Sequence, residues 1–214
     1  MDNSNLFAQV NNIIKTYPII SEQISQKRLQ IILEQLTQCL INNTPGAVIE
    51  FGCYKGTTSL FLRRVLNLED NGRELHVYDS FAGLPAKSIK DASVSGSNFK
   101  AGELKSSKKD LIHNFKKAGL KSPIIHKGWF SDLKDNEVPD LIAFAFLDSD
   151  FYDSILDSLN LVWPKIERGG VIIIDDYQTN NLPGVHRAVE DFFKQLGIAL
   201  NIRHQQDLAI IIKS

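Results

Sequence analysis

The sequence contains few cysteines and no excess of charge of either sign, and both features exclude classes of protein. Cys39 and Cys53 are the two cysteines among 214 residues, which argues against a disulfide framework and fits a reducing compartment, although a single bridge stays open. The 24 basic and 25 acidic side chains leave a formal net charge of -1, so the chain has no basic field that would attract a nucleic-acid backbone.

Long hydrophobic runs are also missing. No apolar run is long enough to span a bilayer, and the N-terminal residues lack the pattern of a signal peptide. We therefore expect a cytoplasmic protein that has neither a nucleic acid nor a membrane as its partner.

The alternation of apolar and amphipathic stretches predicts the fold class. Residues 21–42 carry apolar side chains near helical spacing, which predicts an amphipathic helix. Further along, short apolar runs alternate with helical stretches, as in parallel sheets whose strands are buried on both faces. The runs are AVIEF, ELHVYD, SPIIHKG, DLIAFAFLD, GGVIIIDD and LAIIIKS.

This pattern predicts an α/β protein with a doubly wound, mostly parallel sheet. We expect one globular domain, in which residues 1–44 form an N-terminal helical extension that acts as a lid or as packing, and residues 45–214 form the ligand-binding part. The longest irregular stretch, residues 81–107, exceeds what a plain connection needs. We expect its part from Pro85 to Ser107 to be a lid or a recognition loop.

Ligands of such sheets bind beyond the carboxyl ends of the strands, so the residues after each apolar run are the informative ones. The first run continues as FGCYKGTTS, where Gly52 and Gly56 let the backbone approach a ligand at the start of a helix. A purely structural strand-to-helix turn would use the same residues. Tyr54 interrupts the dinucleotide pattern G-x-G-x-x-G, which disfavours a nicotinamide-dependent oxidoreductase.

Two further strand ends favour a nucleoside ligand. Asp79 ends the second run and can accept the hydroxyls of a ribose, or it can cap the turn that follows. After the third run, Gly128 permits close approach, and Trp129 or Phe130 can cover an adenine, although either aromatic alone is more often part of a core. Together these positions predict a nucleoside with a short polar tail, which is S-adenosylmethionine.

Acidic residues end the next two runs. Asp148 follows the fourth run, and Asp175 with Asp176 follows the fifth, so adjacent parallel strands bring these carboxylates to one edge of the sheet. Their repulsion would raise at least one pKa, and a small hard cation would remove the conflict. Oxygen ligands without nearby Cys or His favour Mg²⁺ or Ca²⁺ over Zn²⁺. The alternative is that these residues only terminate strands, and for Asp153 we prefer the simple interpretation of a helix cap.

The ordered motifs resemble those of the macrocin-type sugar O-methyltransferases. The resemblance implies a class I methyltransferase, with a Rossmann-like sheet, that needs Mg²⁺ and moves a methyl group from S-adenosylmethionine to a hydroxyl. Where that family usually has L-D-G-D, this chain has Ser149 in place of the glycine. The first motif, E-x-G-x-Y-x-G, is also similar to that of catechol O-methyltransferase. The motifs, from about Val48 to Phe193, are VIEFGCYKGTTS, VYDSFAGLP, KGWFSD, LDSDFYDS, GGVIIIDDY and LPGVHRAVEDFF.

The same resemblance implies roles for individual residues. Asp148 would bind the cofactor and the metal and would accept the proton of the acceptor hydroxyl, with Asp150 as the alternative base. Asp175 and Asp176 would complete the metal site. The other cofactor-binding residues would be Glu50, Gly52, Tyr54, Gly56 and Thr58 at the methionine end, Asp79 and Ser80 at the ribose, and Gly128, Trp129 and Phe130 at the adenine.

We therefore expect an S-adenosylmethionine- and Mg²⁺-dependent O-methyltransferase with a small-molecule acceptor, the hydroxyl of a sugar or of a glycosylated compound. A catechol-like or other phenolic acceptor is the alternative within enzymes. From another class, the chain would be a non-catalytic S-adenosylmethionine-binding module, but such a module has no need of the acidic cluster. Assembly into a homo-oligomer stays open.

Overall fold

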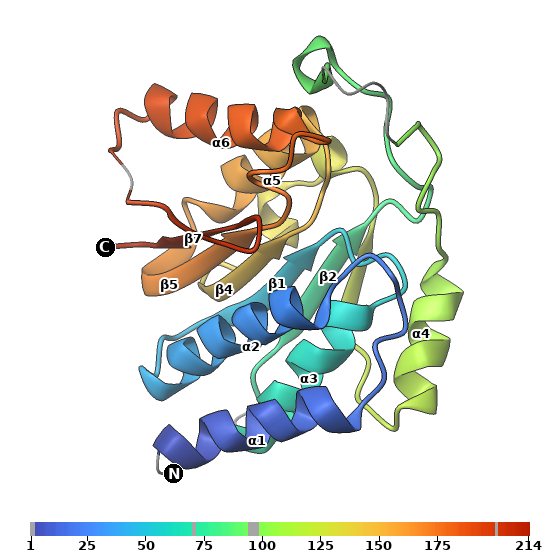
Figure 1. Ribbon diagram of the computed structural model, residues 1–214, viewed down its shortest axis with the longest axis vertical. Coiled ribbons are helices and arrows are strands. Elements are labelled where there is room, and N and C mark those ends of the chain that lie inside the picture. Colours follow the sequence, from blue (N-terminus) through green and yellow to red (C-terminus); the bar gives the residue numbers. More distant parts are fainter. Residues whose placement is uncertain (1–2, 70–71, 94–98, 200) are drawn as a thin grey trace.

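The computed structural model describes residues 3–69, 72–93, 99–199 and 201–214 and has the predicted α/β architecture. In these residues one seven-stranded sheet runs through the molecule in the order β3-β2-β1-β4-β5-β7-β6. Helices cover both of its faces (Figure 1). The strands are β1 (Ala47–Phe51), β2 (Leu75–Asp79), β3 (Ile124–Lys127), β4 (Ile142–Leu147), β5 (Ile166–Ile174), β6 (Arg203–Gln205) and β7 (Leu208–Ile212).

The sheet is parallel except at one edge. Its first five strands pair in parallel, whereas β7 pairs antiparallel with both β5 and β6. The sequence did not predict β6, because its residues are exposed and carry no apolar pattern. On either side of the β1–β4 pair the chain winds in opposite directions, and such a switch point opens a crevice at the carboxyl ends of the strands.

The helices divide into two layers, one on each face of the sheet (Figure 1). Alternate residues of a strand face opposite layers, so Val48 packs in one apolar cluster and its neighbour Ile49 in the other. One layer holds α1 (Asn3–Thr16), α2 (Gln26–Ile41), α3 (Thr57–Glu69) and α4 (Lys108–Lys117), and the other holds α5 (Tyr152–Val162) and α6 (Pro183–Gln195).

The two N-terminal helices share the core of the sheet. Val10 of α1 and Leu29 of α2 are fully buried in the same cluster as Val48 and Phe144 of the sheet. Burial of such a side chain contributes about 1.5–3 kcal/mol relative to exposure. Ser25 caps α2, because its hydroxyl accepts a hydrogen bond from the backbone N–H of Arg28 at 3.2 Å. This cap fixes where α2 begins, and therefore where the Arg28 side chain leaves the helix.

Two details of the sequence prediction are wrong. The edge strand β3 is not buried on both faces, since Ile124 is 42% exposed. Asp153 does not cap a helix, because α5 begins at Tyr152 with Phe151 at the capping position. Asp153 lies in the first turn instead, where a negative charge interacts favourably with the helix dipole.

The long connection between β2 and α4 is tied to the opposite helical layer. The buried carboxylate of Asp91 accepts a hydrogen bond from the backbone N–H of Tyr152 at 2.7 Å. Lys90 forms an ion pair with Asp191 of α6 at 2.9 Å. A side chain at Gly184 would clash, because its Cβ would lie 1.9 Å from an oxygen of Asp91. The predicted lid is thus partly docked, and its residues 94–98 lie outside the described residues.

No helix in the described parts of the chain combines the length and the apolar character needed to cross a membrane.

Candidate active site

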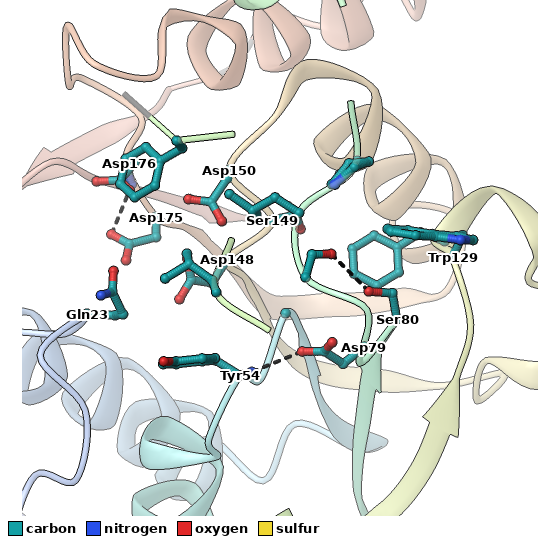
Figure 2. Close-up of a pocket in the computed structure, with 18 residues that line it drawn as sticks. Gln23, Tyr54, Asp79, Ser80, Trp129, Asp148, Ser149, Asp150, Asp175 and Asp176 are labelled. Atoms are coloured by element: carbon teal, nitrogen blue, oxygen red, sulfur yellow. Dashed lines mark hydrogen bonds between the residues drawn. The ribbon is translucent and has the colours of Figure 1, made fainter. Parts of the chain in front are cut away.

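One pocket lies at the carboxyl ends of β1, β2, β4 and β5, where the switch point places it (Figure 2). Four aspartates lie together at one end of the pocket, and Ser80 and Trp129 lie at the other, with Asp79 beside Ser80. Its lining consists of Gln23, Gly52, Tyr54, Asp79, Ser80, Gly83, Leu84, Pro85, Phe99, Leu104, Trp129, Phe130, Asp148, Ser149, Asp150, Ser154, Asp175 and Asp176.

The turn after β1 requires its glycine. Gly52 has φ of +81°, and a Cβ there would lie 1.8 Å from the carbonyl oxygen of Asp148. The ends of β1 and β4 are hydrogen-bonded to each other here, because the backbone N–H of Asp148 donates to the carbonyl of Phe51 at 2.9 Å. Any larger residue at position 52 would therefore push apart the two strand ends that carry the site.

Asp79 ends β2, and its carboxylate is already bonded to the protein. One oxygen accepts the backbone N–H groups of Cys53 at 3.0 Å and Tyr54 at 2.9 Å, and the other accepts that of Phe81 at 2.7 Å. The interpretation of Asp79 as a turn-capping residue is therefore correct. A carboxylate offers about four acceptor positions, so about one stays available on the pocket side.

Four residues that the family resemblance assigned to the cofactor lie outside the pocket lining: Glu50, Gly56, Thr58 and Gly128. Glu50 and Thr58 are buried beneath the turn, and Gly56 packs against Leu111 of α4, where a Cβ would come within 2.2 Å of its methyl carbon. A Cβ at Gly128 would meet no atom within 4 Å, so the surroundings of this residue do not demand glycine.

Glu50 is a buried acid with one hydrogen-bond partner in the part of the chain that the structure describes. The hydroxyl of Ser59 donates a hydrogen bond to its carboxylate. Burial raises the pKa of Glu50 to about 8, the bond from Ser59 opposes this rise, and the charge of Asp79 adds to it. Burial therefore favours the protonated, uncharged form of Glu50.

The end of the pocket away from the acidic residues is largely apolar. Trp129 and Phe130 follow β3, and Phe130 packs edge-on against Phe51 with ring centroids 5.0 Å apart. The loop after β2 adds Phe99 and Leu104. The sequence identified this loop as a candidate recognition element by its length, but nothing in the pattern singled out these two residues.

The acidic end, here called the acidic cluster, consists of Asp148, Asp150, Asp175 and Asp176. Burial raises the pKa of Asp148 well above its ordinary value, and it raises the pKa values of Asp150 and Asp175 to about 7, with the neighbouring carboxylates adding to each rise. Asp150 and Asp176 also have φ of +61° and +54°, which is a strained conformation for residues other than glycine. The predicted convergence and mutual repulsion of these acids are thus present in the structure.

Arg28 reaches this cluster from α2, which the sequence did not suggest. Its guanidinium donates to Asp175 at 2.9 Å and to Asp176 at 3.0 Å. Among the described residues, the carboxylates of Asp148 and Asp150 have no hydrogen-bond or ion-pair partner, and no three His, Cys, Asp or Glu side chains are arranged to hold a metal ion. The expectation that a metal alone compensates the cluster was incomplete.

Ser149 lies between the two ends of the pocket (Figure 2). The residue is 6% exposed, and its hydroxyl oxygen is buried without a hydrogen-bond partner among the described residues. A buried hydroxyl without a partner is costly in a folded protein, and it points to a group that binds there.

A doubly wound sheet with an antiparallel last strand, and with a pocket at the ends of β1, β2 and β4, defines the class I methyltransferase fold. Residues 15–213 match the family model for macrocin O-methyltransferase, TylF, and the chain belongs to this family. It is an O-methyltransferase, and S-adenosylmethionine is its methyl donor. The family membership, the fold class and the enzymatic activity predicted from the sequence are thereby confirmed.

Individual relatives are similar along most of their length. Demethyldecarbamoylnovobiocin O-methyltransferase from Streptomyces niveus is 29% identical over 184 residues, which cover 82% of this chain and 69% of the relative. A 4'-O-methyltransferase from Streptomyces olivaceus, whose substrate is 8-demethyl-8-(2,3-dimethoxy-alpha-L-rhamnosyl)-tetracenomycin C, is 30% identical over 182 residues, with coverage of 82% and 69%. The solved structure of the O-methyltransferase NovP superposes with a TM-score of 0.82 at 26% identity and covers 96% of this chain and 88% of its own.

Proposed function

We propose that this chain is a Mg²⁺-dependent methyltransferase whose acceptor is a hydroxyl of a sugar or of a glycosylated small molecule. The observation that carries the proposal is a pocket with an apolar, aromatic end for the adenosine and an acidic end for the reacting hydroxyl. Two relatives support the sugar acceptor, since they are named for a novobiocin precursor and for a rhamnosyl group.

The cofactor lies along the carboxyl ends of β1 to β3 in this proposal. Trp129 and Phe130 contact the adenine together with Phe99, and Asp79 uses its remaining acceptor position for a ribose hydroxyl, with Ser80 beside it. The turn at Gly52 and Tyr54 lies beside the methionine part. Glu50, Gly56, Thr58 and Gly128 support these groups from outside the pocket wall.

The orphaned hydroxyl of Ser149 is assigned to the bound cofactor. It lies between Asp148 and Asp150 in the chain and lines the pocket, so a ligand that reaches from the aromatic end to the acidic cluster passes beside it (Figure 2). A serine hydroxyl can both donate and accept, and a ribose or an amine can therefore satisfy it.

The chemistry of the donor set fits Mg²⁺, although the described side chains are not arranged around a common point and would have to turn toward one to hold the ion. Asp148, Asp175 and Asp176 supply carboxylate oxygens, which this ion prefers, and no sulfur or imidazole ligand competes for it in the described pocket. Arg28 is bonded to one oxygen each of Asp175 and Asp176, so the second oxygen of each carboxylate remains. When bound, the ion would lower the pKa of the acceptor hydroxyl.

The reaction itself is a displacement at the methyl carbon. The acceptor oxygen forms a bond to this carbon as the carbon–sulfur bond breaks, the electron pair goes to sulfur, and the acceptor proton goes to a carboxylate. Asp148 takes the proton in this proposal, and Asp150 is the second candidate because it lines the same pocket two residues further along the chain. The protein contributes mainly orientation and exclusion of water.

The test is transfer of radiolabelled methyl groups from S-adenosylmethionine to a panel of acceptors. The panel contains glycosides with free hydroxyls, sugar nucleotides and catechols, each with Mg²⁺ and with EDTA. We expect label in sugar-bearing acceptors, and only when Mg²⁺ is present. Transfer to catechols alone would overturn the sugar assignment, and equal transfer in EDTA would overturn the metal.

A further inference from the structure

Arg28 connects three parts of the chain that are remote in sequence. One terminal nitrogen of its guanidinium donates to Asp175 at 2.9 Å and to Asp176 at 3.0 Å. The other donates to Asp207 at 3.1 Å, and the inner nitrogen Nε donates to the carbonyl of Gln206 at 2.9 Å. Among the described residues no other cationic side chain forms an ion pair with the acidic cluster.

The turn between β6 and β7, which lies outside the acidic cluster, also binds the guanidinium of Arg28 and holds it in place. Gln206 and Asp207 form the turn between β6 and β7, with φ of +54° and +64°. The side chain of Arg28 is 17% exposed, and Ser25 fixes the start of the helix that carries it. A planar fork with donors on three nitrogens matches these four acceptors, whereas a lysine ammonium has one donor atom and matches fewer.

The positive charge of Arg28 has two opposite effects, one on the stability of the acidic cluster and one on its affinity for cations. It stabilises a half-buried group of carboxylates that would otherwise repel one another. The same charge repels a divalent cation that approaches Asp175 and Asp176, and it occupies one oxygen of each. At an effective dielectric constant of about 20, unit charges a few ångströms apart interact strongly enough for both effects to be measurable.

We propose that Arg28 is a built-in counter-ion of the acidic cluster, which holds the ligand-free site together and limits its affinity for divalent cations. This inference rests on the Mg²⁺ site proposed above and goes beyond it, because it assigns the N-terminal helical extension a role in metal exchange. Displacement of the charge by a bound ion is not required. Arg28 remains bonded to the β6–β7 turn and sets how tightly an ion is held.

The test compares metal affinity with stability in the same variants. Arg28→Met removes the charge and the donors, whereas Arg28→Gln removes the charge but keeps a two-donor amide. Binding of Mn²⁺, another hard cation that carboxylates bind, is followed at pH 8 by the electron paramagnetic resonance signal of the free ion. Unfolding in urea is measured without metal and with saturating Mg²⁺.

We expect the affinity for Mn²⁺ to rise and the stability without metal to fall in the variants that lack the charge. Both variants should bind Mn²⁺ roughly tenfold more tightly than the wild type, because a repulsive charge is gone. Without metal they should unfold at lower urea concentrations, since Asp175 then stays buried without a counter-charge. Saturating Mg²⁺ should restore most of the lost stability. Arg28→Lys, which keeps the charge, should bind Mn²⁺ within roughly threefold of the wild type.

Arg187→Met is the matched control. This exposed arginine donates to the backbone carbonyls of Lys90 and Ala92 and contacts no carboxylate of the cluster, so its loss should leave Mn²⁺ affinity unchanged. Weaker or unchanged Mn²⁺ binding by Arg28→Gln and Arg28→Met would overturn the counter-ion role and leave Arg28 as ordinary structural support. Failure of all variants and of the wild type to bind Mn²⁺ would overturn the metal site itself, and the counter-ion proposal with it.

Discussion

The carboxylate of Asp79 and the backbone N–H of Tyr54 are joined by a 2.9 Å hydrogen bond that connects the end of β2 to the turn after β1. The same oxygen accepts the N–H of Cys53, so one side chain organises the loop that is proposed to lie beside the cofactor. Asp79 caps this turn, and in the proposed site it also binds the ribose, so it would combine two roles that the sequence presented as alternatives. Its substitution should affect both the fold and the ligand.

Asp79→Ala should weaken S-adenosylmethionine binding by about 1–3 kcal/mol, because a charge-assisted bond to the ribose is lost. It should also lower the free energy of unfolding of the ligand-free protein, since three backbone N–H groups lose their acceptor. Calorimetric titration and urea unfolding measure the two effects. Asp132→Ala, at an exposed residue outside the pocket lining, is the control and should change neither. Unchanged affinity in Asp79→Ala would remove this residue from the cofactor site.

Ser149→Ala should produce effects of opposite sign. The ligand-free protein should become more stable by about 1 kcal/mol, because a buried hydroxyl without a partner is removed. S-adenosylmethionine should bind more weakly, by about 1 kcal/mol, because the ligand loses that hydroxyl as its partner. Thermal unfolding with and without the cofactor reports both changes. A variant that is more stable and binds equally well would show that the hydroxyl does not contact the cofactor.

Glu50 should make the stability of the ligand-free protein depend on pH. Its pKa is about 8 in the folded protein and near 4.5 when exposed, so between these values the folded state keeps a proton that the unfolded chain releases. Stability therefore falls as pH rises through this window and levels off above it. Glu50→Gln removes this contribution, because the amide does not titrate.

The measurement for Glu50 is the difference in the free energy of unfolding between Glu50→Gln and the wild type, taken from about pH 5 to about pH 9. The difference should shift steadily in favour of the variant as pH rises. The acidic cluster titrates in both proteins, and the charge of Glu50 is the smallest of the named contributions to the raised pKa of Asp148, so the comparison reports mainly on Glu50. A difference that stays constant over this range would mean that Glu50 is ionised throughout.

The loop after β2 should close over the bound cofactor. Phe99 and Leu104 line the pocket, so we expect amide hydrogen exchange of residues 99–107 to slow when S-adenosylmethionine binds. The segment Ile89–Asp91 is the internal control, because it is already bonded to α5 and α6 and should change little. Equal exchange of residues 99–107 in both states would argue against a lid.

The sequence predicted those parts of the site that follow from strand ends, and it missed those that depend on long-range packing. Asp148 and Asp175 each follow a continuous apolar run, so their meeting at one edge of the sheet required only the parallel topology. Arg28 is 147 residues from Asp175, and an arginine in an amphipathic helix carries no signal that it points to a pocket. Gln23 lines the pocket from the turn before α2 and was missed for the same reason.

The sequence also left the role of Asp79 undecided for a physical reason. Whether its carboxylate faces a ligand or caps a turn depends on where the N–H groups of the neighbouring loop point, and loop geometry is not encoded in hydrophobic periodicity. The wrong helix cap at Asp153 has a similar origin, because α5 begins directly after the strained turn at Asp150. Boundaries of this kind are set by the tertiary contacts of the strand end.

The acidic cluster should be needed for methyl transfer far more than for cofactor binding. Asp175→Asn and Asp176→Asn remove proposed Mg²⁺ ligands, and Asp148→Asn removes a ligand together with the preferred base, so Asp148→Asn should lower kcat the most. S-adenosylmethionine affinity should change little, because most of the proposed cofactor contacts come from residues that follow β1 to β3. Asp153→Asn is the control, since this residue lies in the first turn of α5 outside the pocket lining. Its cost should be about 0.3–1 kcal/mol of stability.

Removal of Mg²⁺ should abolish methyl transfer and leave cofactor affinity nearly unchanged, as the substitutions of Asp148, Asp175 and Asp176 should. EDTA should stop methyl transfer by the wild type, and added Mg²⁺ should restore it, while calorimetric titration with S-adenosylmethionine gives nearly the same affinity in both conditions. The separation is expected because in the proposed site the ion would contact the acceptor oxygen, whereas the cofactor would be bound mainly by residues of other strands. If Asp148→Asn turns over normally and the wild type is fully active in EDTA, the carboxylates have no catalytic metal, and Arg28 alone compensates Asp175 and Asp176.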